Sequence, residues 1–199
     1  SILAQHEVNN FCKDLSHIVE MEKKGKGQLL NFKTNEATQN YDLKYHRMEW
    51  TVDPAENYIS GEITSYFVPT EDEFQQINFD FADNMTIVEV RYGSELLNAQ
   101  QAEDNLKINL PEIIPNGQLD SISVKYEGAP NSTGFGSFTQ GTHNGVPILW
   151  TLSEPYGAKV WWPCKQDLTD KIDSVDIIVK TPDAYRVGSN GKLISETPE

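Results

Sequence analysis

From Tyr41 onwards, apolar side chains recur at every second position, and this repeat continues through most of the sequence. A strand points successive side chains to opposite faces, so a two-residue repeat predicts half-buried strands. Turn residues, and no helical pattern, separate the predicted strands, so a mainly β fold is favoured, an antiparallel sandwich or a saddle-shaped pair of sheets. The predicted strands lie at residues 41–52, 59–67, 77–81, 85–92, 106–110, 122–126, 148–152 and 175–180.

The sequence also predicts an irregularity in the first strand and a hairpin near residue 190. The parity of the apolar positions changes between Tyr45 and Met48, which predicts a bulge or a bend at residues 46–47 of the first strand. Near the other end of the chain, Asn190-Gly191 is a dipeptide typical of tight hairpin turns. We therefore expect a last hairpin over residues 185–194.

The residues before Tyr41 follow a different period. Between Ala4 and Glu22, apolar side chains recur at intervals of three and four, which predicts an amphipathic helix that stops near Gly25 and Gly27. The polar residues after it are typical of a connection. The sequence therefore predicts an N-terminal helix over residues 1–27, a linker over 28–40 and a β domain over 41–199.

Charge narrows the range of partners. The chain has 30 acidic and 16 basic residues and a formal net charge of −14. Nucleic acids and anionic membranes bind basic surfaces, so neither is an expected partner. No apolar run in the sequence reaches the length of a membrane span. Residues 1–4 resemble the end of a cleaved secretory signal, which favours an exported, periplasmic or extracellular protein; if they only begin the helix, a cytoplasmic location is the alternative.

The two cysteines, Cys12 and Cys164, lie far apart and show no metal-binding spacing. A disulfide between them is compatible with the sequence, but nothing indicates one. Cys164 follows an aromatic run, so we expect it to be a buried free thiol.

Residues 131–145 are rich in Gly, Ser and Thr and predict a long loop. It leads to residues 150–167, where tryptophans are interspersed with Pro155 and Pro163. Proline fixes φ and lacks an amide donor, so this stretch should be an ordered but irregular connection. Trp161 and Trp162 are adjacent and should point to opposite sides, so at least one of them should be buried.

The same stretch carries a family resemblance. In their order and spacing, its residues resemble the signature of the aminopeptidase N family of zinc metallopeptidases, in the domain that precedes the catalytic one. Residues 125–128 and 189–193 resemble further landmarks of that family, so the similarity covers roughly residues 41–196. The matching positions are Thr151, Glu154, Pro155, Ala158, Lys159, Pro163, Cys164, Asp167 and Lys171.

The resemblance implies a role for Glu154. The matching Glu of the family binds the α-ammonium group of a peptide substrate, and such charge-assisted hydrogen bonds are the stronger kind. Leu152 takes the place of a Gln that often lines the pocket for the first side chain of the substrate. Leucine cannot hydrogen-bond, so we expect a more apolar pocket. Asp167 and Lys171 match the pattern too, and we expect them to have structural roles.

The chain has no catalytic motif of its own. It lacks H-E-x-x-H, cysteine pairs with zinc spacing and a nucleophile elbow, and Asn10 stands where a zinc helix beginning at His6-Glu7 would need a second His. The resemblance implies that the parent enzyme binds zinc through a catalytic domain of the same polypeptide, outside this chain. We therefore expect a non-catalytic substrate-recognition and scaffold domain, and a chain that is a piece of a longer zinc aminopeptidase.

Other functions stay open. A free-standing β-sandwich module could bind a glycan or a protein, with Trp161 and Trp162 as an exposed stacking platform. Alternatively, the parent enzyme could hydrolyse an epoxide, as in the leukotriene A hydrolase branch of the same family.

Overall fold

The structure is a computed structural model that describes residues 34–131, 137–154 and 156–197. The helix predicted over residues 1–27 lies outside these ranges. Strands dominate the described residues, and most neighbouring strands are antiparallel, so the predicted mainly β, antiparallel fold is confirmed. None of the helices in the described part of the chain has the length and apolar character that a membrane span requires.

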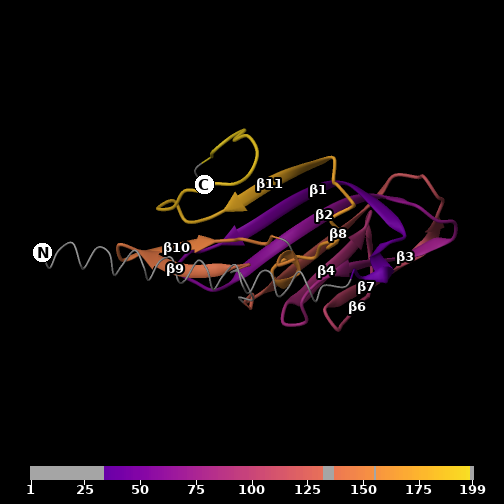
Figure 1. Ribbon diagram of the computed structural model, residues 1–199, viewed down its shortest axis with the longest axis horizontal. Helices are drawn as coiled ribbons and strands as arrows, with labels where there is room; N and C mark the ends of the chain where they lie inside the picture. The colour runs from indigo at the N-terminus through magenta and orange to yellow at the C-terminus, as the bar shows by residue number, and fades with distance from the viewer. Residues whose placement is uncertain (1–33, 132–136, 155, 198–199) are drawn as a thin grey trace, which may run out of the picture.

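The largest sheet has six strands in the order β11-β1-β2-β8-β4-β5 (Figure 1). Neighbours within it pair antiparallel except β11, which lies parallel to β1 at the edge of the sheet. The strands are β1 (Tyr41–Val52), β2 (Ile59–Pro69), β4 (Thr86–Tyr92), β5 (Glu95–Leu96), β8 (Asp120–Gly128) and β11 (Ser174–Lys180).

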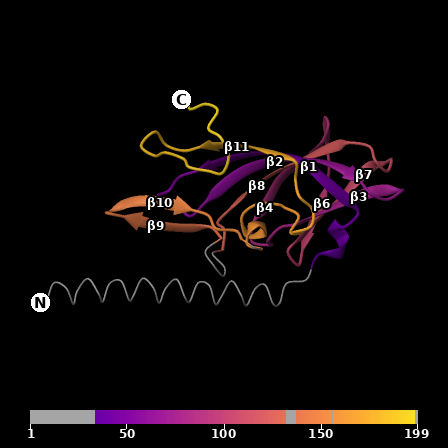
Figure 2. The same cartoon turned by 45° about the horizontal axis from the view of Figure 1, so that its top comes forward.

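Two smaller sheets complete the described fold. One has the order β3-β7-β6 and consists of β3 (Phe74–Asp80), β7 (Asn105–Ile114) and β6 (Ala99–Ala102). The other is a hairpin of β9 (Thr139–His143) and β10 (Val146–Trp150). Figures 1 and 2 agree in placing this hairpin at the opposite end of the molecule from β3, β6 and β7.

Aromatic side chains from the six-stranded and three-stranded sheets meet in one core. Tyr41 of β1 contacts Phe67 of β2 and, across the layers, Phe74 and Phe79 of β3, with ring centroids 6.0 to 6.3 Å apart. All four rings are buried. Such tilted and edge-on pairs add to the stabilisation that area burial provides.

The first strand has its bulge at a different place from the predicted one. The register of β1 against β2 shifts between Leu43 and Tyr45, so the prediction of a bulge at residues 46–47 was wrong. Tyr45 instead lies on the outer face, 5.3 Å from the ring of Tyr66, and His46 is buried. The error arose because Tyr45 was counted on the same face as Tyr41 and Leu43.

The predicted loop over residues 131–145 and the predicted last hairpin both need correction. Residues 139–150 form the β9–β10 hairpin, and its turn residues Asn144 and Gly145 have φ of 52° and 80°. This is the backbone that favours Asn-Gly in tight hairpins. Asn190-Gly191 has no hairpin around it, since the described residues 181–197 contain no strand. Leu193 and Ile194 there are 74% and 85% exposed, so no packing supports a strand.

Candidate functional site

Residues 150–167, called the corner segment here, run from the end of β10 toward β11. A parallel strand pair needs a crossover connection, and this segment begins the one that brings β11 beside β1. It contains the short 3₁₀ helix η2 (Ala158–Val160) and is otherwise irregular in its described part, as its prolines predicted.

Asp80, the last residue of β3, fastens the corner segment to the body. Its backbone forms an isolated bridge with Cys164, with N···O distances of 2.7 and 3.0 Å. One carboxylate oxygen accepts the amide of Gln166 at 2.9 Å, and the other accepts the side-chain amide of Asn35 at 3.2 Å. Burial raises the pKa of Asp80, and these hydrogen bonds act in the opposite direction.

The repeat predicted a half-buried strand at this place, but its polar positions are buried as well. Asn78 and Asp80 are 2% and 9% exposed. The corner segment and the short 3₁₀ helix η1 (Glu36–Thr38) supply their partners: Asn78 donates to the carbonyl of Ala37 at 3.3 Å, and Asn35 caps η1. Polar residues can be buried when they are hydrogen-bonded, and here the partners come from distant parts of the chain.

A buried ion pair forms a second attachment. The side chains of Lys165 and Asp170 are 4% and 8% exposed, and the ammonium lies 2.6 Å from the carboxylate. Lys165 also donates to the carbonyl of Tyr41 at 2.6 Å, and Asp170 accepts the amide of Leu43 at 3.2 Å. The pair therefore ties the residues just after Cys164 to the beginning of β1.

Asp167 has a structural role, as expected. One oxygen of its carboxylate accepts both the amide and the hydroxyl of Thr169, at 2.8 and 2.7 Å. Partial burial acts to raise the pKa of Asp167, but hydrogen bonds from Thr169 and Gln39 outweigh it and hold the pKa below its ordinary value. Lys171 is exposed. Cys164 is a buried free thiol, and burial raises its pKa well above the ordinary value, as an inert cysteine requires.

Tryptophans anchor the middle of the corner segment. Trp161 is buried, with its ring centroid 4.8 Å from that of Trp50 and 6.1 Å from that of Phe138. Trp162 is half-buried and meets the ring of His46 edge-on at 5.5 Å. The two rings lie at 66° to one another. A glycan-stacking module needs both rings exposed on a flat face, so this arrangement counts against that alternative.

Glu154 directly follows Ser153, a residue that two hydrogen bonds hold in place. The carbonyl of Ser153 accepts the amide of Gly157 at 2.7 Å, and its hydroxyl accepts the indole N–H of Trp161 at 2.8 Å. Glu154 itself is exposed, and Leu152, on the other side of Ser153, is half-buried. The structure therefore brings the two predicted site residues to one surface turn that the core holds in place.

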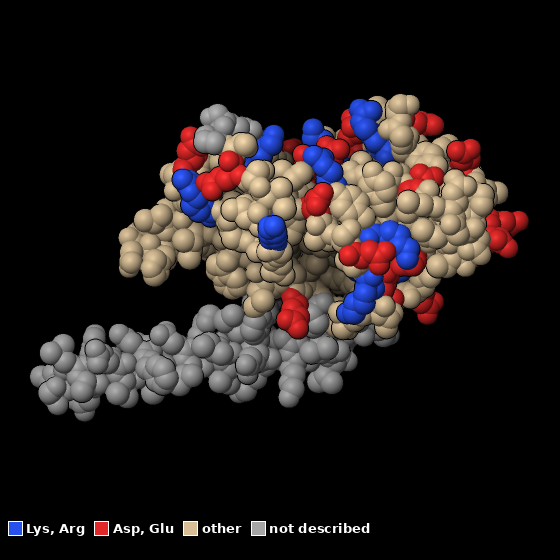
Figure 3. All heavy atoms as spheres, turned by 90° about the horizontal axis from the view of Figure 1, so that it is seen from above, with Lys and Arg blue, Asp and Glu red and all other residues tan. Residues whose placement is uncertain are grey.

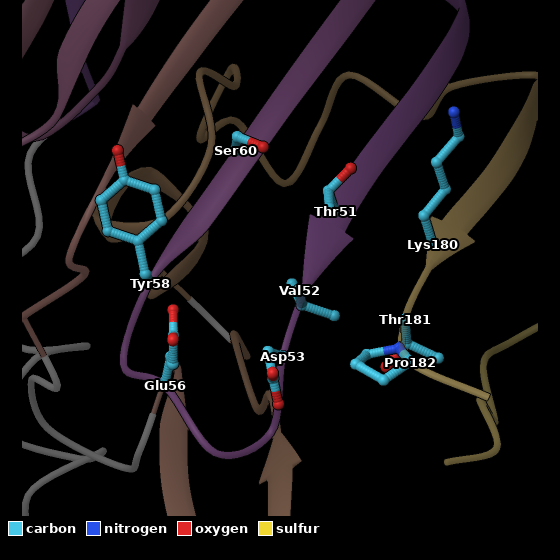
Figure 4. A pocket seen from close by; sticks show the side chains of 9 residues that line it. All are labelled: Thr51, Val52, Asp53, Glu56, Tyr58, Ser60, Lys180, Thr181 and Pro182. Carbon is cyan, nitrogen blue, oxygen red and sulfur yellow. The ribbon is translucent and has the colours of Figure 1, made fainter. Parts of the chain in front are cut away.

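A surface hollow of about 400 Å³ lies at the turn between β1 and β2, and neither Glu154 nor Leu152 lines it. In Figure 4, Asp53, Glu56 and Tyr58 lie on one side and Lys180, Thr181 and Pro182 on the other. Asp53 accepts the amide of Ala55 at 2.8 Å and so stabilises its own turn. In the ranges that the structure describes, no three His, Cys, Asp or Glu side chains are grouped to hold a metal ion.

The sequence did not single out the residues that hold the site. Asp80, Lys165 and Ser153 position the corner segment, but nothing near them in sequence marks them. Lys165 and Asp170 are five residues apart in a predicted connection, where charged residues are normally solvated. Only the packing of the segment against β1 and β3 identifies them.

No protein-family model and no curated protein matches the chain. Solved structures do match it. One is a two-domain M1 zinc metallopeptidase bound to L-arginine, with a TM-score of 0.71 and 19% identity over 82% of this chain and 38% of that chain. A mutant M1 zinc metallopeptidase from Deinococcus radiodurans bound to a Tyr-Ser-Ala substrate has a TM-score of 0.67 and 19% identity over 81% and 37%. Native yeast LTA4 hydrolase has a TM-score of 0.60 and 14% identity over 72% and 23%.

The chain thus spans less than two fifths of the length of the metallopeptidases that it matches. At these identities the likeness concerns the fold. The resemblance noted at residues 150–167 is confirmed at that level: this chain has the fold of a domain found in M1 zinc metallopeptidases and in LTA4 hydrolase.

Proposed function

We propose that this chain is the substrate-recognition and scaffold domain of a zinc aminopeptidase, and that Glu154 binds the α-ammonium group of the peptide substrate. The observation that carries the proposal is the exposed carboxylate of Glu154 beside Ser153, which a hydrogen bond within the turn and a second one to the buried Trp161 hold in place. The likeness to a metallopeptidase bound to a Tyr-Ser-Ala substrate supports the substrate class.

The chemistry follows from what an aminopeptidase must distinguish. A free N-terminus carries an ammonium group, and an internal peptide bond does not. A carboxylate at a fixed point forms a charge-assisted hydrogen bond with that ammonium group. The same contact limits how far the peptide enters, so only its first peptide bond reaches the catalytic centre.

The zinc of the proposed enzyme would be held by other residues of the polypeptide, because the described residues offer no suitable group of ligands. When bound, zinc polarises a carbonyl and activates water for hydrolysis. The partners of this domain are then the peptide N-terminus and the zinc domain of the same polypeptide. The role of this chain is to bind and orient the substrate.

Leu152 would form one wall of the pocket for the first side chain of the substrate. It is half-buried and lies two residues before Glu154. An apolar wall favours apolar side chains and leaves polar ones without a hydrogen-bond partner.

The test is Glu154→Gln in the zinc-containing polypeptide. Loss of one charge-assisted hydrogen bond costs roughly 1.5–3 kcal/mol, so kcat/KM for peptides with a free N-terminus should fall roughly 10- to 150-fold. Zinc content and unfolding temperature should not change. Glu112→Gln, which neutralises an exposed carboxylate on β7, is the matched control and should leave kcat/KM unchanged. Unaltered kinetics in Glu154→Gln would remove Glu154 from the site.

A second candidate is epoxide hydrolysis by the parent enzyme, and the likeness to yeast LTA4 hydrolase supports this candidate. That match has a lower TM-score and covers less of the chain than the metallopeptidase matches. Assaying the polypeptide with both a free-amine peptide and a lipid epoxide carrying a carboxylate separates the two reactions.

A further inference from the structure

One long stretch of the sequence carries no charged side chain. No Lys, Arg, Asp or Glu occurs between Glu127 and Glu154, although 23% of all residues in the chain are charged. The β9–β10 hairpin lies in this stretch. In Figure 3 it is the lobe that projects at the left, with no blue or red side chains on it.

One face of the hairpin is fixed to the body of the domain. Leu149 packs against the core, and the side-chain amide of Gln140 donates to the carbonyl of Pro54 at 2.9 Å. These two residues are directly opposite one another in the hairpin register, so their side chains lie on the same face.

The other face, called the outer hairpin face here, is apolar and exposed. Val146, Ile148 and Trp150 are 55%, 39% and 37% exposed. Their cross-strand partners are His143, Gly141 and Thr139, none of which carries a carboxylate, ammonium or guanidinium group. A sheet face in contact with water normally carries polar side chains. Depletion of charge together with exposed aromatic and aliphatic side chains is instead typical of the core of a protein interface.

The position of the face indicates what covers it. It ends at Trp150, two residues before Leu152 and four before Glu154. Any domain that completes a substrate site at Glu154 must therefore lie next to it. The matched metallopeptidases also have more than half of their length outside the matched part, enough for a further domain.

We propose that the outer hairpin face packs against the zinc-binding domain of the same polypeptide and so fixes the distance between Glu154 and the metal. This inference rests on the proposed function, which it extends by naming the surface through which the two domains contact each other.

Site-specific photo-crosslinking tests it in the full-length polypeptide. A benzoylphenylalanine at position 148 should crosslink within one molecule to residues of the zinc-binding domain, as mapped by mass spectrometry. The same probe at Val88, which is 50% exposed on β4, is the control and should give no such crosslink. Crosslinks from position 148 only to a second copy, no crosslink at all, or equal crosslinking from position 88 would each overturn the proposal.

A substitution provides a second readout. Ile148→Glu should leave the stability of the 199-residue chain unchanged, because the side chain is exposed there. In the full-length polypeptide it should separate the unfolding of the two domains, whereas Val88→Glu should not. Neither experiment depends on activity. An intramolecular crosslink together with normal kinetics in Glu154→Gln would support the interface and reject Glu154 as a substrate-binding residue. No crosslink together with impaired kinetics in Glu154→Gln would reject the interface and support the role of Glu154.

Discussion

His46 lies in the middle of β1 with 3% of its surface exposed, and its Nδ1 is 3.0 Å from the hydroxyl of Ser65 on the neighbouring strand. Burial disfavours the imidazolium form and lowers the pKa of His46 from 6.5 to about 4. The folded protein therefore holds a neutral imidazole over a pH range in which the unfolded chain would bind a proton.

This difference predicts a pH-dependent stability. Because the folded pKa lies below the unfolded one, the contribution of His46 is fully present above pH 6.5 and is lost as the pH falls toward 4. At about 1.36 kcal/mol per pKa unit, the loss reaches roughly 3 kcal/mol near pH 4. Urea unfolding of the wild type and of His46→Gln at a series of pH values separates the contribution of His46 from that of the titrating carboxylates. A wild type and variant that lose stability in parallel between pH 7 and 4 would contradict the assignment.

Leu152 gives a prediction about specificity at the same scale. If the proposed aminopeptidase role is correct, Leu152→Gln should shift the preference from apolar toward polar first residues, by roughly 10-fold in the ratio of kcat/KM values, because one hydrogen-bonding group is gained. The measurement is a comparison of N-terminal leucine and glutamine peptides. An unchanged ratio would show that Leu152 does not line the pocket.

At the scale of elements, the corner segment depends on one close approach of backbone to side chain. A Cβ added at Gly157 would lie 2.1 Å from the hydroxyl of Ser137 and 3.2 Å from the Cα of Ser153. Ser153 is also the residue that fixes the backbone beside Glu154. A side chain at position 157 would therefore disturb both the packing and the proposed site.

Gly157→Ala should accordingly destabilise the protein by roughly 1–3 kcal/mol, the usual cost of overpacking. The emission of Trp161 should shift as the hydrogen bond to Ser153 is lost. The control is Gly188→Ala, since nothing lies within 4 Å of a Cβ built there. Urea unfolding of the two variants measures the difference, and equal stabilities would mean that Ser137 moves aside at no cost.

The local sequence pattern predicted most of the strands, but it did not predict which distant residues pack against them. Alternation identified β1, β2, β7 and β8 because each has one buried face. It did not reveal the burial of Asn78 and Asp80, because η1 and the corner segment, which are distant in sequence, cover their outer face. The hairpin of β9 and β10 was missed for a related reason: β9 is polar, and its turn signal at Asn144-Gly145 was interpreted as part of a loop.

At the scale of the whole molecule, the sequence was sufficient to predict the fold class and to suggest the motif on which the proposed site rests. The spacing from Thr151 to Lys171 predicted a fold that the solved structures then confirmed. The parallel placement of β11 could not be predicted from periodicity, since alternation carries no information on strand direction or order. Nor does the sequence mark which of its exposed apolar residues gather on one face.

The pairing of β1 with β11 has a consequence for how this protein is made. Tyr45 lies opposite Ser174, so β1 receives its second neighbour only after residues 174–180 have left the ribosome. Until then one edge of β1 is open, and open strand edges pair readily with other chains. The six-stranded sheet is therefore incomplete until β11 has been synthesised, and a nascent chain is more prone to aggregate in the interval before β11 pairs with β1.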